Sequence, residues 1–218
     1  MMSRTPPLGI ILRHAELPGI TRAEQIMSMS AILHRRWTED EVRRLIDDAP
    51  GSTPRYELVD GDLLVTPAPS RLHQRVVFEL ATLLRAFVTA HGVGEVAISP
   101  SDVRLAPGLV VQPDLFVVPS DSGRRPRADV PTTRLVLAVE VLSPGSARFD
   151  RVVKRHAYQA AGVPEYWIVD VDARTIERWR PGEVRPEVNE ATMSWNPPSA
   201  RESLSLDLTQ FFGSVSDD

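Results

Sequence analysis

The chain has 218 residues, 42% of them hydrophobic and 25% charged, which is the composition of an ordinary soluble globular protein. This length is enough for one full hydrophobic core. The absence of cysteine excludes disulfides, zinc–thiolate sites and cysteine nucleophiles, and it is consistent with a reducing cytoplasm. No apolar run reaches the roughly 18–20 residues of a membrane span, and no export signal is evident, so we expect a cytoplasmic protein without membrane contact. Because the net charge is −4, any contact with nucleic acid must use local basic patches.

The first 28 residues differ in pattern from the rest of the chain. Residues 1–28 show little hydrophobic periodicity, and we expect them to form a flexible N-terminal extension. The patterned sequence begins at Met29. We therefore expect a single domain over 29–212 and a disordered tail over 213–218.

The domain begins with a short helix, a hairpin and a long helix. Thr38 and Glu41 form a capping box, which predicts a short helix up to about residue 47. Two apolar runs around an Asp-Gly pair predict a β-hairpin over 56–65. From 71 to 91, leucine, valine and phenylalanine recur at helical spacing, and Gly92 ends that helix.

Short apolar runs follow the long helix. They predict strands over 95–98, 102–105 and 110–118. The polar loop over 119–134 contains Arg124, Arg125 and Arg127, which either contact a nucleic-acid backbone or are simply solvated. Residues 135–142 are apolar on both alternating faces except for one acid, which predicts a central strand.

The remaining elements continue the alternation of strands and helices. The pattern predicts a helix over 148–161 and a hairpin with strands over 165–171 and 175–179. Past Pro181 the sequence reads as irregular, up to an apolar run over 204–208 and an exposed Phe211-Phe212 pair. This order of elements predicts one α/β domain with a mixed sheet.

Two of the predicted strands each contain a single acid. Asp114 lies in the apolar run 110–118 and Glu140 in 135–142. An ionised carboxylate in a core strand is costly unless it is paired or binds a metal. If the two strands pair, both carboxylates project from the same end of the sheet, and their oxygens suit Mg²⁺. Two other interpretations stay open: Asp114 is a strand-edge acid that follows a proline, or Glu140 is paired with an arginine such as Arg134 or Arg178.

A lysine and two further polar residues accompany the acids. Lys154 is able to orient a water or to stabilise developing charge. The alternative is a solvated lysine, because Lys154 lies far from the centre of the apolar helix face made by Phe149, Val152, Val153, His156 and Ala160. Glu57 is either a further acid of a metal site or a polar residue on a half-exposed strand. His73 either binds a phosphate or a metal-bound water, or is solvated.

Other enzyme classes lack their defining motifs. The chain has no P-loop and no GxSxG, and the Gly92-Val-Gly94 string is not a dinucleotide fingerprint. We therefore expect no organic cofactor.

Several strings match one family in order and at sensible spacing. They are the hairpin string from Tyr56, Pro69-Ser-Arg-Leu-His73, Gln112-Pro-Asp114, Val139-Glu140-Val-Leu-Ser143-Pro, Lys154, Tyr158 and Gly162-Val-Pro-Glu165-Tyr-Trp-Ile-Val-Asp170. Over roughly 29–181 the chain resembles the Uma-type restriction endonucleases of the PD-(D/E)xK nuclease superfamily. The resemblance implies a restriction-endonuclease-like core, in which a mixed central β-sheet is flanked by helices.

The resemblance also implies roles for the site residues. Asp114 corresponds to the aspartate of the motif and Glu140 to its second acid, and both would bind Mg²⁺, with Mn²⁺ as a substitute. Leu142 stands where the simple motif has lysine. In this family the lysine is displaced onto the following helix, which selects Lys154. Glu57 and His73 match recurrent family positions and would support the other three.

The implied activity is metal-dependent hydrolysis of DNA phosphodiester bonds by an endonuclease. A homodimer would serve to cut both strands, and the Phe211-Phe212 pair would contribute to its interface. One alternative is a catalytically inactive nuclease-fold module that binds nucleic acid or a protein partner. Another is a nuclease that acts on RNA, because function resides in the site and not in the fold.

Overall fold

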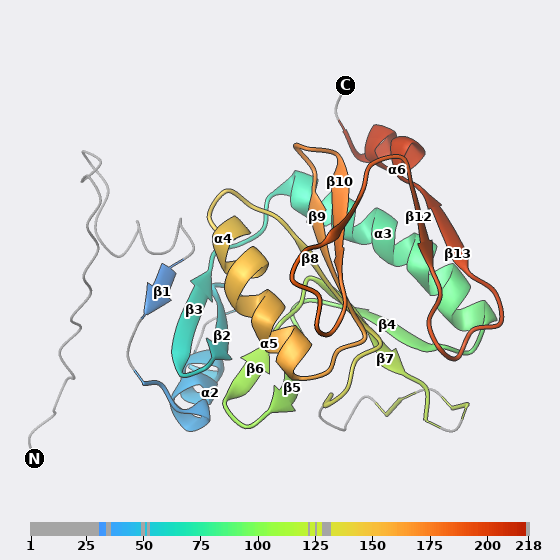
Figure 1. The fold of residues 1–218 in the computed structure, drawn as a ribbon. Coiled ribbons are helices and arrows are strands. Elements are labelled where there is room, and N and C mark those ends of the chain that lie inside the picture. Colours follow the sequence, from blue (N-terminus) through green and yellow to red (C-terminus); the bar gives the residue numbers. More distant parts are fainter. Residues whose placement is uncertain are drawn as a thin grey trace, which may run out of the picture.

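A six-stranded sheet, a five-stranded sheet, a two-stranded sheet and the helices around them make up the described part of the protein (Figure 1). The computed structural model describes residues 31–216 apart from 34–35, 49–50, 52, 122, 125 and 128–131. The expected extension over 1–28 lies outside the described residues. Among the described helices, none combines the length and the apolar character needed to cross a bilayer.

The larger sheet is mixed, as the sequence predicts. Its order is β11-β10-β9-β8-β7-β4. The strands are β4 (Gly94–Ile98), β7 (Leu115–Pro119), β8 (Leu137–Val141), β9 (Glu165–Asp170), β10 (Thr175–Trp179) and β11 (Glu187–Asn189). Among these strands only β8 and β9 pair in parallel. A parallel pair needs a crossover connection, which the helix between these two strands provides. All residues of β8 are buried, which confirms the predicted central strand.

The smaller sheet contains the predicted hairpin. Its order is β1-β3-β2-β6-β5, with β1 (Ala31–Leu33), β2 (Arg55–Val59), β3 (Asp62–Thr66), β5 (Val103–Ala106) and β6 (Leu109–Val111). Asp60 and Gly61 connect β2 to β3 with φ of 53° and 86°, the left-handed values that a tight hairpin turn requires. Helix α2 (Glu39–Asp47) begins at the predicted capping box and packs through Val42 on the outer face of this sheet.

The prediction of a single strand over 110–118 is wrong. The chain forms β6 in the smaller sheet and β7 in the larger one, and Gln112, Pro113 and Asp114 lie between them. Pro113 has no N–H to donate to a ladder, which favours a break in pairing at this point. Asp114 therefore lies where the chain passes from one sheet to the other.

Helices cover both faces of the larger sheet (Figure 1). One face packs against α3 (Arg71–Ala90), α6 (Leu208–Val215) and the two-stranded sheet of β12 (Thr192–Trp195) and β13 (Leu204–Asp207). The other face packs against one continuous helix made of α4 (Ala147–Phe149), a π-helical segment η1 (Asp150–Lys154) and α5 (Arg155–Ala160). The smaller sheet packs on this second face as well, so a second core lies between the two sheets.

The C-terminal part is more ordered than the sequence predicts. The region past Pro181 was expected to be irregular, yet it forms β11, β12, β13 and α6. Phe211 and Phe212 are 4% and 1% exposed, so the expected exposed pair at a dimer interface is wrong. Together with Leu208 and Val215 they occupy helical positions i, i+3, i+4 and i+7 and form the buried face of α6. That helix continues three residues beyond the expected domain end at 212.

Phe212 is predicted to be essential for stability. Replacing a fully buried phenylalanine by alanine removes apolar burial and leaves a cavity, so Phe212→Ala should lower the free energy of unfolding by about 3–5 kcal/mol. Phe78, on α3, is 66% exposed, and Phe78→Ala should change stability by less than about 0.5 kcal/mol. Urea unfolding of both variants measures the difference. Equal stabilities would show that α6 does not contribute to the core.

Candidate active site

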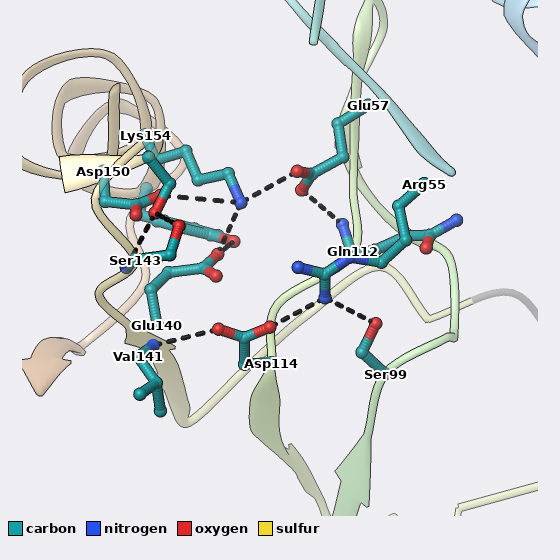
Figure 2. Close-up of polar contacts among 12 residues, drawn as sticks. Arg55, Glu57, Ser99, Gln112, Asp114, Glu140, Val141, Ser143, Asp150 and Lys154 are labelled. Carbon is teal, nitrogen blue, oxygen red and sulfur yellow. Dashed lines mark hydrogen bonds and ion pairs between the residues drawn. The ribbon is translucent and has the colours of Figure 1, made fainter. Parts of the chain in front are cut away.

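Strand alternation brings charged side chains into the space between the two sheets. On β2, Arg55 and Glu57 alternate with outward residues and point to the same side as Val59, which belongs to the core between the sheets. On β8, Glu140 points to the same side as Ala138, which belongs to the same core. The polar residues therefore face one another across an otherwise apolar layer (Figure 2).

Strand β7, which Asp114 immediately precedes, pairs with β8, which carries Glu140. In the antiparallel β7–β8 ladder, Leu115 lies opposite Val139. The next pair of opposing positions is therefore Asp114 and Glu140. The backbone N–H of Val141 donates to Oδ2 of Asp114 at 2.9 Å. Asp114 is 3% exposed and precedes a strand with neighbours on both sides, so the interpretation as a strand-edge acid is wrong.

Lys154 is the cation shared by the acids. Its Nζ donates to Oε1 of Glu140 at 2.9 Å, lies 2.9 Å from Oε2 of Glu57 and lies 3.8 Å from Oδ1 of Asp150. The contact with Glu57 is an ion pair without hydrogen-bonding direction. Lys154 is 2% exposed, so the solvated interpretation is wrong. The predicted arginine partner for Glu140 is wrong too, since Arg178 pairs with Glu187 and Arg134 is exposed.

The helix that carries Lys154 buries a different face from the predicted one. Val152, His156 and Ala160, expected in the apolar face, are exposed. The buried side chains are Phe149, Asp150, Lys154, Ala157 and Tyr158. The π-helical turn shifts the residues that follow it around the axis, and π turns are frequent at functional sites. The buried carboxylates of β2 and β8 also need a cation, which an apolar helix face would not supply.

Asp114 is held by three donors. Arg55 Nη1 donates to Oδ1 at 2.7 Å, and His73 Nε2 lies 2.9 Å from Oδ2, where it must donate to the carboxylate. Burial alone would raise the pKa of Asp114, but the hydrogen bond and charge of His73, with the charges of Arg55 and Lys154, hold that pKa well below its usual range. Asp114 is therefore ionised.

The pKa values of Glu140 and Asp150, in contrast, are raised. Burial raises the pKa of Glu140 well above its ordinary value, although Lys154 opposes the shift. Burial likewise raises the pKa of Asp150 to about 6. Burial would lower the pKa of Lys154, but Glu140 and Glu57 hold it above its usual range, so Lys154 stays charged.

The cluster has an excess of acids. Four buried carboxylates lie with two permanent cations and one histidine: Glu57, Asp114, Glu140 and Asp150 with Arg55, Lys154 and His73. Hard oxygen donors and an excess of negative charge suit a divalent cation of the Mg²⁺ type. Within the described ranges, however, no three His, Asp or Glu side chains are already arranged as a metal-binding group. The donor chemistry fits such an ion, and water or substrate would have to complete its coordination.

Solvent reaches only part of the cluster. An open cleft of about 450 Å³ is lined by Asp114, His73 and Arg55, whereas Glu140 and Lys154 lie behind them. Of the arginines in the 119–134 loop, Arg124 and Arg127 are exposed and outside the lining of this cleft, and Arg125 lies outside the described residues.

Three members of the cluster were not singled out from the sequence. Arg55 lies two residues before Glu57 and so shares its strand face, a signal that the alternation contains. Asp150 and Tyr158 lie four residues before and after Lys154. Tyr158 donates its hydroxyl to Oε1 of Glu140 at 3.1 Å. The sequence therefore shows an acid, a lysine and a tyrosine at i, i+4 spacing on one helix. It does not show which residues of other elements they contact.

Comparison with known proteins places the chain in a family. Residues 40–209 match the family model Uma2, described as "Putative restriction endonuclease". The chain belongs to the Uma2 family. A crystal structure of "a putative nuclease belonging to DUF820" from Anabaena variabilis superposes with a TM-score of 0.67 at 20% identity, covering 83% of this chain and 99% of that one. The resemblance in fold to a nuclease confirms the predicted fold class. No curated protein matches significantly.

In this Uma2 protein, loss of the shared lysine should be strongly destabilising. Lys154→Met leaves buried carboxylates without their cation and should lower the free energy of unfolding by about 3–5 kcal/mol. Adding Glu140→Gln should restore part of that loss. Arg151→Met is the matched control on the same helix. Its ion pair with Asp170 is partly exposed and should be worth about 1 kcal/mol or less. Equal losses at Lys154 and Arg151 in urea unfolding would contradict the assigned role.

Asp150 should make stability depend on pH. Its pKa rises from 3.8 to about 6 on folding, so between these values the folded protein holds a proton that the unfolded chain has released. The stabilisation from Asp150 is complete below about pH 4, and ~3 kcal/mol is lost as the pH rises through 6. Asp150→Asn should remove this dependence, so its stability relative to wild type should increase from pH 4 to pH 7. Parallel stability curves in urea unfolding would exclude the shift.

Proposed function

We propose that this Uma2 protein is a divalent-metal-dependent endonuclease that hydrolyses phosphodiester bonds of DNA. The observation that carries the proposal is the meeting of Asp114, Glu140 and Lys154 in one buried cluster beside an open cleft. Membership of a family described as restriction endonucleases and a fold shared with a nuclease structure support it. The arrangement agrees with the acid, acid and lysine of the PD-(D/E)xK pattern, with the lysine displaced onto the helix.

Asp114 and Glu140 are the residues that would hold Mg²⁺ or Mn²⁺. When bound, such an ion polarises a phosphoryl oxygen and lowers the pKa of a bound water. Asp114 is already ionised, as a ligand must be. The excess of acids over cations in the cluster provides the negative charge that a divalent ion would neutralise.

The remaining side chains would act on substrate and water. Lys154, held charged by Glu57 and Glu140, would orient a water or stabilise charge that develops on the phosphate. His73 fixes the orientation of Asp114 through its hydrogen bond to Oδ2. Arg55 lines the cleft and presents a guanidinium, the group best suited to a phosphate.

One observation favours a second function, a catalytically inactive nuclease-fold module. Asp114 already forms hydrogen bonds with Arg55 and His73, and Glu140 already forms one with Lys154. The acids of the cluster are therefore paired with other residues of the protein. Such a module would bind nucleic acid or a protein partner without turnover, with salt-sensitive binding in the case of nucleic acid. Cleavage of RNA is the remaining variant of the first function. Paired cleavage by a homodimer would require a surface other than the buried Phe211-Phe212 pair.

Metal binding and cleavage together test the proposal. Isothermal titration calorimetry with Mg²⁺ and Mn²⁺ should show binding to wild type that weakens in Asp114→Asn and in Glu140→Gln. The same variants should lose at least about 10²-fold in cleavage of plasmid DNA, the order of loss when one charge-stabilising group is removed. These near-isosteric changes keep the packing of the site, and circular dichroism checks the fold.

Asp170→Asn is the matched control. Asp170 ends β9 in the same sheet and pairs with Arg151 outside the cluster, so its loss should leave metal binding and cleavage unchanged. Cleavage that survives in Asp114→Asn or Glu140→Gln would remove these residues from the active site. Wild type that binds neither metal and cuts neither plasmid nor single-stranded DNA or RNA would favour the inactive module.

A further inference from the structure

An exposed phenylalanine lies at the wall of the cleft that leads to Asp114. Phe78 is 66% exposed on α3, where it follows Gln74 and precedes Thr82 at helical i, i+4 spacing on an otherwise polar stripe. In the part of the chain that the structure describes, it is the one aromatic residue among the exposed large hydrophobic side chains. Removing this ring from water would be favourable, so the position suits contact with a ligand.

A second apolar side chain lines the same cleft from another element. Ile98, the last residue of β4, is 48% exposed and lines the cleft together with Phe78. Strand β4 packs beside α3, so the two side chains come from neighbouring elements that are distant in sequence (Figure 1). The volume of about 450 Å³ is within the usual range for a small-molecule site. A single nucleotide is of that size.

Two buried nitrogens of polar residues at the cleft have no hydrogen-bond partner among the described residues. Arg55 is 9% exposed, and its Nε is buried without a hydrogen-bond partner, although Nη1 bonds to Asp114 and Ser99. His73 Nδ1 is also buried without a partner. An unpaired buried guanidinium nitrogen is costly, and because Arg55 lines the cleft, an anion there would lie beside its positive charge. One cleft therefore offers an aromatic ring, an aliphatic side chain and a donor suited to a phosphate oxygen.

We propose that this cleft binds an unpaired nucleobase, stacked on Phe78 and flanked by Ile98, with the adjoining phosphate on Arg55. The inference rests on the proposed function and names its substrate class: single-stranded DNA, or duplex with an extrahelical base next to the cleaved bond. Bases inside a paired duplex are stacked on their neighbours and cannot offer a face to Phe78. Unpaired bases stack readily on aromatic side chains without regard to sequence.

The experiment compares three DNAs of the same sequence on the full-length protein without divalent metal. Fluorescence anisotropy gives the Kd for a single strand, for a paired duplex and for a duplex with one bulged base. Wild type should bind the single strand and the bulged duplex more tightly than the paired duplex. Phe78→Ala should weaken binding to those two DNAs by about tenfold or more, the loss typical of one stacked base. Its affinity for the paired duplex should not change.

Two further variants separate stacking from a general effect on the helix. Phe78→Trp retains an aromatic face and should keep wild-type affinity for the single strand. Leu83→Ala removes another exposed apolar side chain of α3 that lies outside the lining of the cleft, and it should bind all three DNAs as wild type does. Both outcomes together assign the effect to a ring at position 78.

Other results would overturn the inference, and they can be told apart from a failure of the proposed function. If wild type cuts plasmid DNA with Mg²⁺ but Phe78→Ala weakens binding to all three DNAs equally, or to none of them, only the proposed base site is wrong. If wild type neither cuts nor binds any DNA, the nuclease proposal fails and the base site with it. If Phe78→Ala converts a dimer to a monomer in light scattering, Phe78 is a subunit contact and the base site is wrong.

Discussion

The contacts of Lys154 with Glu57 and Glu140 join three parts of the protein that are distant in sequence. Glu57 belongs to the smaller sheet, Glu140 to the larger sheet, and Lys154 to the helix that packs on both. Desolvation of three charged groups costs about as much as their attraction returns, so an apolar trio of similar volume would serve stability equally well. Stability alone therefore does not explain why these ion pairs are buried.

The apolar surroundings of this cluster separate the acids into two kinds. Asp114 immediately precedes β7 and Glu140 lies on its partner strand β8, yet their pKa values move in opposite directions. Burial is common to both, but Asp114 has His73 and Arg55 as partners, whereas Glu140 shares a single lysine with two other acids. Environments that drive the pKa values of neighbouring carboxyl groups apart are typical of active sites. The difference gives Asp114 a fixed charge, whereas the charge of Glu140 depends on its contact with Lys154.

Local sequence patterns predicted most of the helices and strands. The features that the sequence did not predict depend on contacts between those elements. The hairpin at 56–65, helix α3 and the buried strand β8 depend on turn residues and periodicity, which are readable within a short window. The run 110–118 is uniformly apolar, and such a run does not reveal that the chain changes sheets at Pro113. Counting apolar residues also selected the wrong helix face, because Lys154 is buried for its acidic partners on β2 and β8 and not for its hydrophobicity. Arg55 was missed for the same reason.

The position of Arg55 links substrate binding to cation binding under the proposed function. Its guanidinium lines the cleft beside Asp114, and Nη1 donates to both Asp114 and Ser99. A phosphate in the cleft would compete with Asp114 for this guanidinium, and an Asp114 oxygen released in that way would become available to a divalent ion. Each ligand would then favour the other by the same factor, as linkage requires. Under the proposed function, this coupling would explain why no three acids or histidines among the described residues already form a metal-binding group.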